Sequence, residues 1–403
     1  MSILRDLRAL PPIQIIGAGT HMIPVPAECV SWEVWLFGGG GSGGVARGTA
    51  AKATGGAGGC YGHIKRPLLA GVSSLTAVLG LPGNGVEISS DTTSSGNSAQ
   101  NSTLTDGTVT LTVPGGGAGN AAVSPITSVP AALMGSTPTV SDGGDIETAL
   151  GGASGAISGV STDHRTVTGG GGPGGPWGDG ASSGVILGNW NGATGGASAF
   201  FPSGSVTGEL SVPAVTGGGG QGGKSGDNDG SVAGTGGGGA WGSSPDNTAN
   251  GYGAGMPNTN SSFNRVSGAD QVTGLNPVSG LYFTLSGHCQ GNIGGPTFYT
   301  TAGPGGGGGG MFYVGSGNIR HGGMGGWFGG GGGYYINGSQ PILSPHGGFM
   351  GGGGGLCVNT QSGAGGDGGV SAGGGGTSGI STGAISSGNG GSPYIAVIYY
   401  VSN

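Results

Sequence analysis

The segment with the strongest resemblance to a chemical motif is a match to a phosphate-binding loop. Gly218 to Ser225 reads Gly-Gly-Gly-Gln-Gly-Gly-Lys-Ser. In nucleotide-binding proteins such a loop follows an apolar strand and opens a helix whose N-terminus holds the phosphate. Here the residues that follow Gly223, Lys-Ser-Gly-Asp-Asn-Asp-Gly, have no helical pattern. Because a chain this rich in glycine produces such a match by chance, we predict no nucleotide and no other cofactor.

Acidic residues at two places could bind a cation or act as acid and base. Asp227-Asn228-Asp229-Gly230 begins like a calcium loop, but Gly238 stands at position twelve, where an EF-hand loop has Glu. Asp142, Asp145 and Glu147 could hold a cation or act as paired carboxylates. We interpret both segments as solvated turns. The six histidines show no ligand spacing, so we predict neither a metal site nor an enzyme.

Aromatic side chains in the long polar segments are the residues that we expect to bind a partner. Trp and Tyr combine a flat apolar surface with a polar group, which suits both glycans and protein surfaces. Aromatic residues that flank the glycine runs, such as Trp327 and Tyr334, are expected instead to cover the faces of the packed runs. The residues predicted to bind such a partner are Trp177, Trp190, Trp241, Tyr252 and Phe263.

Glycine dominates the composition and decides which elements can position these side chains. Of the 403 residues, 110 are glycine and 7% are charged, against usual shares of roughly 7% and roughly 25%. Collagen requires glycine at every third position, but here glycine comes in solid runs. Disorder is disfavoured because 34% of the residues are hydrophobic and gather in short β-like segments. A packed arrangement of glycine runs remains.

Ordered glycine loses more backbone entropy than any other residue, so the backbone itself must stabilise the runs. In polyglycine II geometry each N–H and C=O points outward, and without Cβ atoms such helices can pack side by side and bond to one another. A single run would be unstable, so we predict a stack. The longer runs are 169–175, 217–223, 236–239, 305–310, 329–333, 351–355 and 373–376.

Strand patterns lie at both ends of the chain. Alternating residues at 32–37 and the apolar segment 393–401 read as strands, and so do 13–17, 60–69, 74–81 and 108–113. The predicted fold class is all-β with stacked polyglycine II helices, almost no α-helix, and a β-sandwich-like base built from N- and C-terminal strands. The predicted domains are a docking arm (1–25), the base (26–120, closed by 393–401) and a glycine bundle with variable loops (121–392).

The first dozen residues form a short amphipathic piece that Pro11-Pro12 ends, either one or two turns of helix or a docking arm. Its predicted docking residues are Leu4, Leu7 and Leu10. The start of the chain lacks the apolar core of a signal peptide, and no segment reaches the 18 apolar residues of a membrane helix. We therefore expect synthesis in the cytoplasm without membrane insertion, and cysteines that are reduced and buried. The net charge of −7 argues against nucleic-acid binding.

The strand Pro26-Ala-Glu-Cys-Val-Ser-Trp-Glu-Val-Trp-Leu-Phe37 runs into Gly-Gly-Gly-Gly-Ser-Gly-Gly, and the chain closes on Gly-Gly-Ser-Pro-Tyr-Ile-Ala-Val-Ile-Tyr-Tyr. These features resemble glycine-rich tail-fibre proteins of tailed bacteriophages, and in part the distal tail-fibre adhesins of T-even-type phages. The resemblance covers about 13–120 and 300–403 and is compositional between them. It implies a virion protein, assembled in the host cytoplasm, that attaches to a glycan or outer-membrane protein. It also implies contact with other tail proteins through the N-terminus, and a homotrimer.

Three alternatives remain open at this point. A tailspike enzyme that degrades surface polysaccharide would need a cleft with two carboxylates about 5–9.5 Å apart. A purely structural virion protein would need no receptor-binding loops. An ice-binding glycine bundle would need regular Gly-x-x spacing and a flat threonine face, and the sequence presents neither.

Overall fold

The computed structural model describes residues at both ends of the chain and shorter pieces between them. Within these residues the protein is all-β and contains no helix. The described residues are 7–123, 125–160, 162, 165–176, 178–184, 186–187, 190–193, 195–196, 224–227, 272–275, 282–285, 311–314, 325, 330–331, 333–337, 342–343, 346–358 and 362–402.

Two sheets form one end of the molecule, which we call the base. The first, sheet 1, is six-stranded, with β2 (Ile13–Ile16) also paired to β30. Its order is β1 (Leu7–Ala9), β30 (Tyr394–Ser402), β4 (Cys29–Phe37), β7 (Tyr61–Pro67) and β15 (Glu147–Ala149). The five-stranded sheet 2 runs β14 (Thr139–Val140), β12 (Thr110–Val113), β11 (Ser102–Thr105), β8 (Ser74–Leu79) and β3 (Gly19–Pro24).

The helical reading of the first dozen residues is wrong for the part that the structure describes. Leu7–Ala9 is the strand β1, antiparallel to β30, with Leu7 opposite Ser402. Pro11 and Pro12 then separate β1 from β2, which pairs with the earlier half of β30. Proline has no N–H to donate, so it is tolerated at this sheet edge. The predicted strands at 13–17 and 393–401 are confirmed, and they share one sheet.

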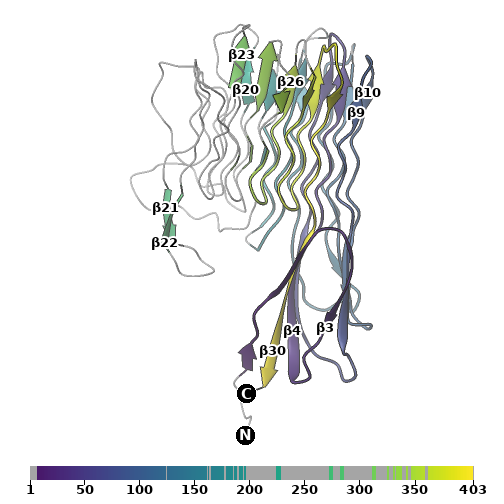
Figure 1. Ribbon diagram of the computed structural model, residues 1–403, viewed down its shortest axis with the longest axis vertical. Helices are drawn as coiled ribbons and strands as arrows, with labels where there is room; N and C mark the ends of the chain where they lie inside the picture. Colours follow the sequence, from purple (N-terminus) through teal and green to yellow (C-terminus); the bar gives the residue numbers. More distant parts are fainter. Residues whose placement is uncertain are drawn as a thin grey trace.

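Short strands form the opposite end of the molecule, which we call the far end. A six-stranded sheet there runs β10 (Thr93–Ser94), β5 (Val45–Arg47), β28 (Thr377–Gly379), β26 (Leu356–Val358), β24 (Tyr334–Asn337) and β23 (Met311–Val314). A five-stranded sheet runs β13 (Ala121–Ala122), β6 (Lys52–Ala53), β17 (Thr166–Val167), β19 (Trp190–Ala193) and β20 (Lys224–Asp227). The remaining strands are β25 (Ile342–Leu343), β27 (Gly363–Ala364), β29 (Ile385–Ser386) and β9 (Glu87–Ile88) in one sheet, and β16 (Ile157–Ser158) with β18 (Ile186–Leu187). The strands β21 (Val272–Leu275) and β22 (Tyr282–Leu285) pair with each other and lie apart from the far end in Figure 1.

Figure 1 shows the two ends along the long axis of the molecule. The strands β3, β4 and β30 lie at the base, where the first and last described strands pair, and β9, β10 and β26 lie at the far end. Extended segments, many of them glycine runs, connect the two ends side by side. We call these segments the glycine region.

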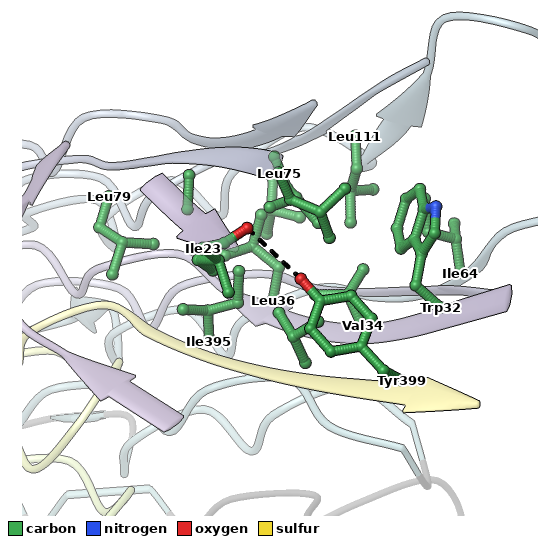
Figure 2. Close-up of a cluster of buried hydrophobic side chains, with 14 of the residues drawn as sticks. Ile23, Trp32, Val34, Leu36, Ile64, Leu75, Leu79, Leu111, Ile395 and Tyr399 are labelled. Atoms are coloured by element: carbon green, nitrogen blue, oxygen red, sulfur yellow. Dashed lines mark hydrogen bonds between the residues drawn. The ribbon is translucent and has the colours of Figure 1, made fainter. Parts of the chain in front are cut away.

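The core of the base is built from side chains of both sheets (Figure 2). Alternation in β4 turns Trp32, Val34 and Leu36 inward, each 0% exposed, while Glu33 and Trp35 lie on the other face. Leu75 from sheet 2 faces them, and the hydroxyl of Tyr399 reaches the Ile23 carbonyl at 3.5 Å. Other members of this core are Ile64, Ala77, Leu79, Leu104, Leu111, Val113, Ile395 and Val397.

Backbone hydrogen bonds between neighbouring segments hold the glycine region. The run 38–44 donates to the segment 54–60 from every third residue: Gly38 N to Cys60 O (3.0 Å), Gly41 N to Ala57 O (2.9 Å) and Gly44 N to Thr54 O (2.8 Å). The same run donates to a second segment from Gly40 and Gly43, to Gly391 O and Gly388 O, and to a third from Ser42, to Asn97 O. Its own carbonyls accept from Gly83, Gly116, Gly119 and Gly374.

Neighbouring backbones in this region are too close for side chains. A Cβ atom on Gly40 would lie 1.9 Å from the Ala372 carbonyl oxygen, and one on Gly43 would lie 2.1 Å from that of Gly375. A Cβ on Gly41 would lie 2.0 Å from the oxygen of Gly117. Glycine is therefore required at these positions, because the backbone of a neighbouring segment lies too close for a side chain.

Two tight turns between glycine segments lie where the glycine region meets the base. Gly351 N bonds to Gly348 O (2.8 Å), and Ala372 N bonds to Gly369 O (2.9 Å). Each turn places a residue other than glycine in the left-handed region, Met350 at φ 61° and Ser371 at φ 62°. The Met350 side chain is fully buried in a cluster with Phe37, Tyr61 and Ala149 on the outer face of sheet 1.

Candidate functional site

The structure describes few of the residues predicted to bind a partner. Trp177, Trp241, Tyr252 and Phe263 lie outside the described residues. Trp190 begins β19 at the far end, and its side chain is not described. The prediction that these aromatic residues bind a receptor therefore stays a prediction.

The predicted docking residues separate into different environments. Leu4 lies outside the described residues. Leu7 is 48% exposed in β1, whereas Leu10 packs against the core of the base. Of the two described leucines, Leu7 is the one available to a partner.

A partly buried arginine at the far end contacts two loops that are distant in sequence. Arg47 ends β5, and its side chain is 13% exposed. Its Nη1 donates to the Gly383 carbonyl at 3.0 Å and to the Ser89 carbonyl. Its Nε lies 3.0 Å from Asp91 Oδ1, an ion pair without hydrogen-bond alignment. Its backbone N–H donates to Thr92 O at 2.8 Å.

The loops that Arg47 joins present short polar side chains to solvent. Ser89, Ser90 and Thr92 are exposed, and the Asp91 side chain is 74% exposed. From the other loop Ile380 is 38% exposed. We call residues 89–92 and 380–383 the tip surface. Sequence reasoning missed it because the only local signal was a single arginine in a short strand between glycine runs.

An ionic network crosses the outer face of sheet 1 in the base. The His63 ring contacts a carboxylate through each nitrogen, Nε2 to Glu33 Oε1 at 2.8 Å and Nδ1 to Glu147 Oε2 at 2.9 Å. The other Glu33 oxygen accepts from the Tyr400 hydroxyl and lies 3.8 Å from Lys65 Nζ. The Lys65 ammonium in turn lies 3.7 Å from the centroid of the Tyr400 ring.

Mutual contacts set the pKa values of this network. Burial alone would raise the pKa of Glu33, but hydrogen bonds from Tyr400 and His63 and the nearby charges of His63 and Lys65 outweigh it, so its pKa is lowered. Burial, followed by the bond to Glu33 and its charge, raises the pKa of Tyr400 to about 12. These pairings link the strands β4, β7, β15 and β30 across the outer face of sheet 1.

The acidic residues at 142–147 are used in similar pairings. Asp142 accepts from Arg66 Nε at 3.3 Å and from the Gly144 N–H at 2.9 Å. The Gly144 bond and then Arg66 lower the pKa of Asp142. Glu147 contacts His63 in the network described above. Two of the three carboxylates therefore have basic partners in the base.

The outer face of sheet 2 carries threonines in two ranks. Thr103 lies opposite Val78 and Thr112, and Thr112 lies opposite Thr139. None of the five strands contains Asp, Glu, Lys or Arg. The expectation that a threonine face is absent is therefore wrong, because the threonines come from strands separated in sequence. The face consists of Thr20, Thr76, Thr103, Thr105, Thr110, Thr112 and Thr139, with exposed Met22 and Val78.

Three cysteines are described, and all are buried and free, as expected: Cys29, Cys60 and Cys357. Burial raises the pKa of each thiol. Over the described ranges, no group of three or more His, Cys, Asp or Glu side chains is arranged to hold a metal ion. In the same part of the chain no helix has the length and apolar character needed to cross a membrane.

Known proteins give no further assignment. The chain matches no model of a known protein family. It also matches no curated protein sequence.

Proposed function

We propose that the protein is a receptor-binding protein of a bacteriophage tail fibre. It attaches the virion to the host surface through loops carried on stacked polyglycine II helices. Its base is a β-sandwich of sheets 1 and 2 that connects to other tail proteins near the N-terminus. The assembled fibre contains a homotrimer of this chain, and assembly takes place in the host cytoplasm.

The observation that carries the proposal is the period of three in the glycine region. Polyglycine II has three residues per turn and no internal hydrogen bonds. Donation from Gly38, Gly41 and Gly44 to one neighbour, and from Gly40 and Gly43 to another, follows that period. Each turn thus directs one N–H toward each of several neighbours, which supports a stack of helices rather than a sheet.

The position of both described chain ends at one end of the molecule supports an adhesin. The first and last described strands pair in the base, with Leu7 opposite Ser402. The strands β9, β10 and β26 lie at the far end (Figure 1). A protein anchored through its termini would present the far end outward. In the glycine region between the two ends, backbone groups form hydrogen bonds between neighbouring segments, which suits a stiff spacer.

Binding and localisation test the proposal. Labelled full-length protein should bind particular strains in a panel of bacteria and should compete with the phage that infects them. Antibodies against the chain should label the fibre tips of that phage in electron micrographs. Labelling confined to the capsid, or protein that does not compete with adsorption, would contradict the proposal. Alanine substitution of Trp190 or Trp241 then tests the aromatic-loop prediction, and unchanged adsorption for both would remove it.

Ice binding is a second candidate because of the threonine face on sheet 2. The rank of Thr103, Thr112 and Thr139 presents methyl and hydroxyl groups at the strand repeat, about 4.8 Å between strands. In the other rank the hydroxyls of Thr105 and Thr110 bond to each other at 3.1 Å. An ordered water lattice is the surface that such an uncharged, regular array would match. Thermal hysteresis in a solution of the purified protein would support this function, and normal ice growth would exclude it.

A further inference from the structure

We propose that Arg47 is a positioning residue that holds the tip surface in the shape of a binding site for a neutral glycan. The inference rests on the proposed function, since it assigns the receptor contact to described residues of the far end. It differs from the aromatic-loop prediction in both the residues and the segments involved.

One side chain links two loops that flank the paired strands β9 and β29. Through Nη1 Arg47 contacts carbonyls of Ser89 and Gly383, which are 42 and 336 residues from it in sequence. Guanidinium is planar with donors at fixed angles, so it fixes both loops at once. An ammonium group on a flexible stem would not impose the same geometry.

The support beneath the tip surface is well ordered by backbone pairing. The strand β5 pairs in parallel with β28, with Ala46 opposite Ser378. Gly48 N continues the pairing by donating to Gly379 O at 2.9 Å, one residue before Ile380. Binding sites keep their geometry best when they are mounted on such regular elements.

The chemistry of the tip surface fits a neutral glycan. The exposed hydroxyls of Ser89, Ser90 and Thr92 can both donate and accept hydrogen bonds. In the other loop of the tip surface, Ile380 offers an aliphatic side chain that is 38% exposed. The charge of Arg47 is balanced by Asp91, whose carboxylate stays 74% exposed as an acceptor for sugar hydroxyls. An anionic polysaccharide would meet no unpaired cation among these residues.

The base provides a matched control for Arg47. Arg66 also has a nearly buried side chain, 15% exposed, and it also pairs with an aspartate, Asp142. It lies at the opposite end of the molecule, near the end of β7. Loss of either arginine removes a similar ion pair, but only Arg47 supports the tip surface.

The experiment measures binding of labelled full-length protein to the bacterial strains that the wild type recognises. Arg47→Ala and Arg47→Lys should each weaken binding about tenfold or more, whereas Arg66→Ala should leave it unchanged. Melting temperatures of all variants should remain within a few degrees of the wild type. Ser90→Tyr, which adds bulk to the exposed surface without touching Arg47, should also weaken binding and guards against misfolding of the arginine variants.

Treatment of the cells identifies the chemistry of the ligand. Periodate oxidation of the cells should abolish wild-type binding, and protease treatment should leave it intact. Protease-sensitive, periodate-resistant binding would overturn the glycan assignment in favour of a protein receptor. Equal binding by wild type, Arg47→Ala and Ser90→Tyr would overturn the tip assignment while the proposed function stands. Failure of the wild type to bind any strain in a broad panel would instead count against the proposed function itself.

Discussion

The base and the glycine region are stabilised by opposite means. In the base, large side chains such as Trp32 and Tyr399 fill the space between two sheets (Figure 2). In the glycine region the space between chains is occupied by backbone, so that a Cβ on Gly58 would lie 2.1 Å from the Gly172 oxygen. Hydrophobic burial stabilises the base. In the glycine region, hydrogen bonds between neighbouring segments satisfy the backbone N–H and C=O groups.

The two regions should therefore respond to opposite kinds of mutation. In the base, removing atoms leaves a cavity and lowers stability. In the glycine region, added atoms force neighbouring segments apart and break hydrogen bonds on several sides. A single added methyl group is the smallest change that distinguishes the two mechanisms.

We expect the largest effect from Gly58→Ala. The added Cβ would meet Gly172 O at 2.1 Å and Gly172 C at 2.5 Å, both backbone atoms that cannot rotate away. We expect a loss of more than about 4 kcal/mol in the free energy of unfolding, or insoluble protein. The control is Gly71→Ala, at a turn with nothing within 4 Å of the new Cβ and φ +89°. It should lose only about 1–2 kcal/mol, from left-handed strain. Equal losses in denaturant titrations would contradict close packing of the glycine segments.

Truncation in the core of the base comes next. Leu75 is 0% exposed and faces β4 from sheet 2. Leu75→Ala should lower the free energy of unfolding by about 2–5 kcal/mol through lost burial and a residual cavity. Val78→Ala on the outer face of the same strand, 42% exposed, should change it by less than about 1 kcal/mol. Equilibrium unfolding in guanidinium chloride measures both, and similar values would argue against a core between the two sheets.

The junction between the regions gives a smaller effect of opposite sign. Ser371 combines φ 62° with a buried hydroxyl that has no hydrogen-bond partner. Ser371→Gly should relieve both defects and raise the free energy of unfolding by about 1 kcal/mol. Met350→Gly relieves similar backbone strain, but it removes a fully buried side chain and should be destabilising by about 2 kcal/mol. Thermal melts of the two variants should shift in opposite directions, and a stabilised Met350→Gly would show that strain outweighs burial there.

The sequence predicted the base better than it predicted the far end. Alternation in 32–37 and the apolar segment 393–401 identified β4 and β30, because side-chain periodicity survives in a sheet with one buried face. Two-residue strands such as β6 and β13 have no such period. Their position depends on neighbouring glycine runs, and glycine carries no side-chain pattern from which pairing could be inferred.

The candidate site shows the same limit. Arg47 acquires its role from Ser89 and Gly383, and nothing in the residues near it predicts that those loops meet. The threonine face was missed for a related reason, since Thr103 and Thr112 share a row with Thr139 only after three strands have paired. Local motifs such as the phosphate-loop match can be found in the sequence, but a chain this rich in glycine produces them by chance, so they do not identify a site.

The smallest effect that we expect is a pH dependence confined to the base. Glu33 has a pKa lowered from its ordinary 4.5 by hydrogen bonds and nearby positive charges that outweigh its burial. A carboxylate with a lowered pKa in the folded state adds stability above its unfolded pKa, and this contribution is lost as pH falls through the folded value. The free energy of unfolding should therefore decrease from about pH 4.5 downward, by about 1 kcal/mol or less for this group. In E33Q that part of the acid dependence should disappear. The glycine region should contribute little to it, because most of its hydrogen bonds join uncharged backbone groups. Urea titrations at pH 3 and pH 6 measure how much the free energy of unfolding changes between the two pH values. The same change in E33Q as in the wild type would assign the acid sensitivity to other carboxylates.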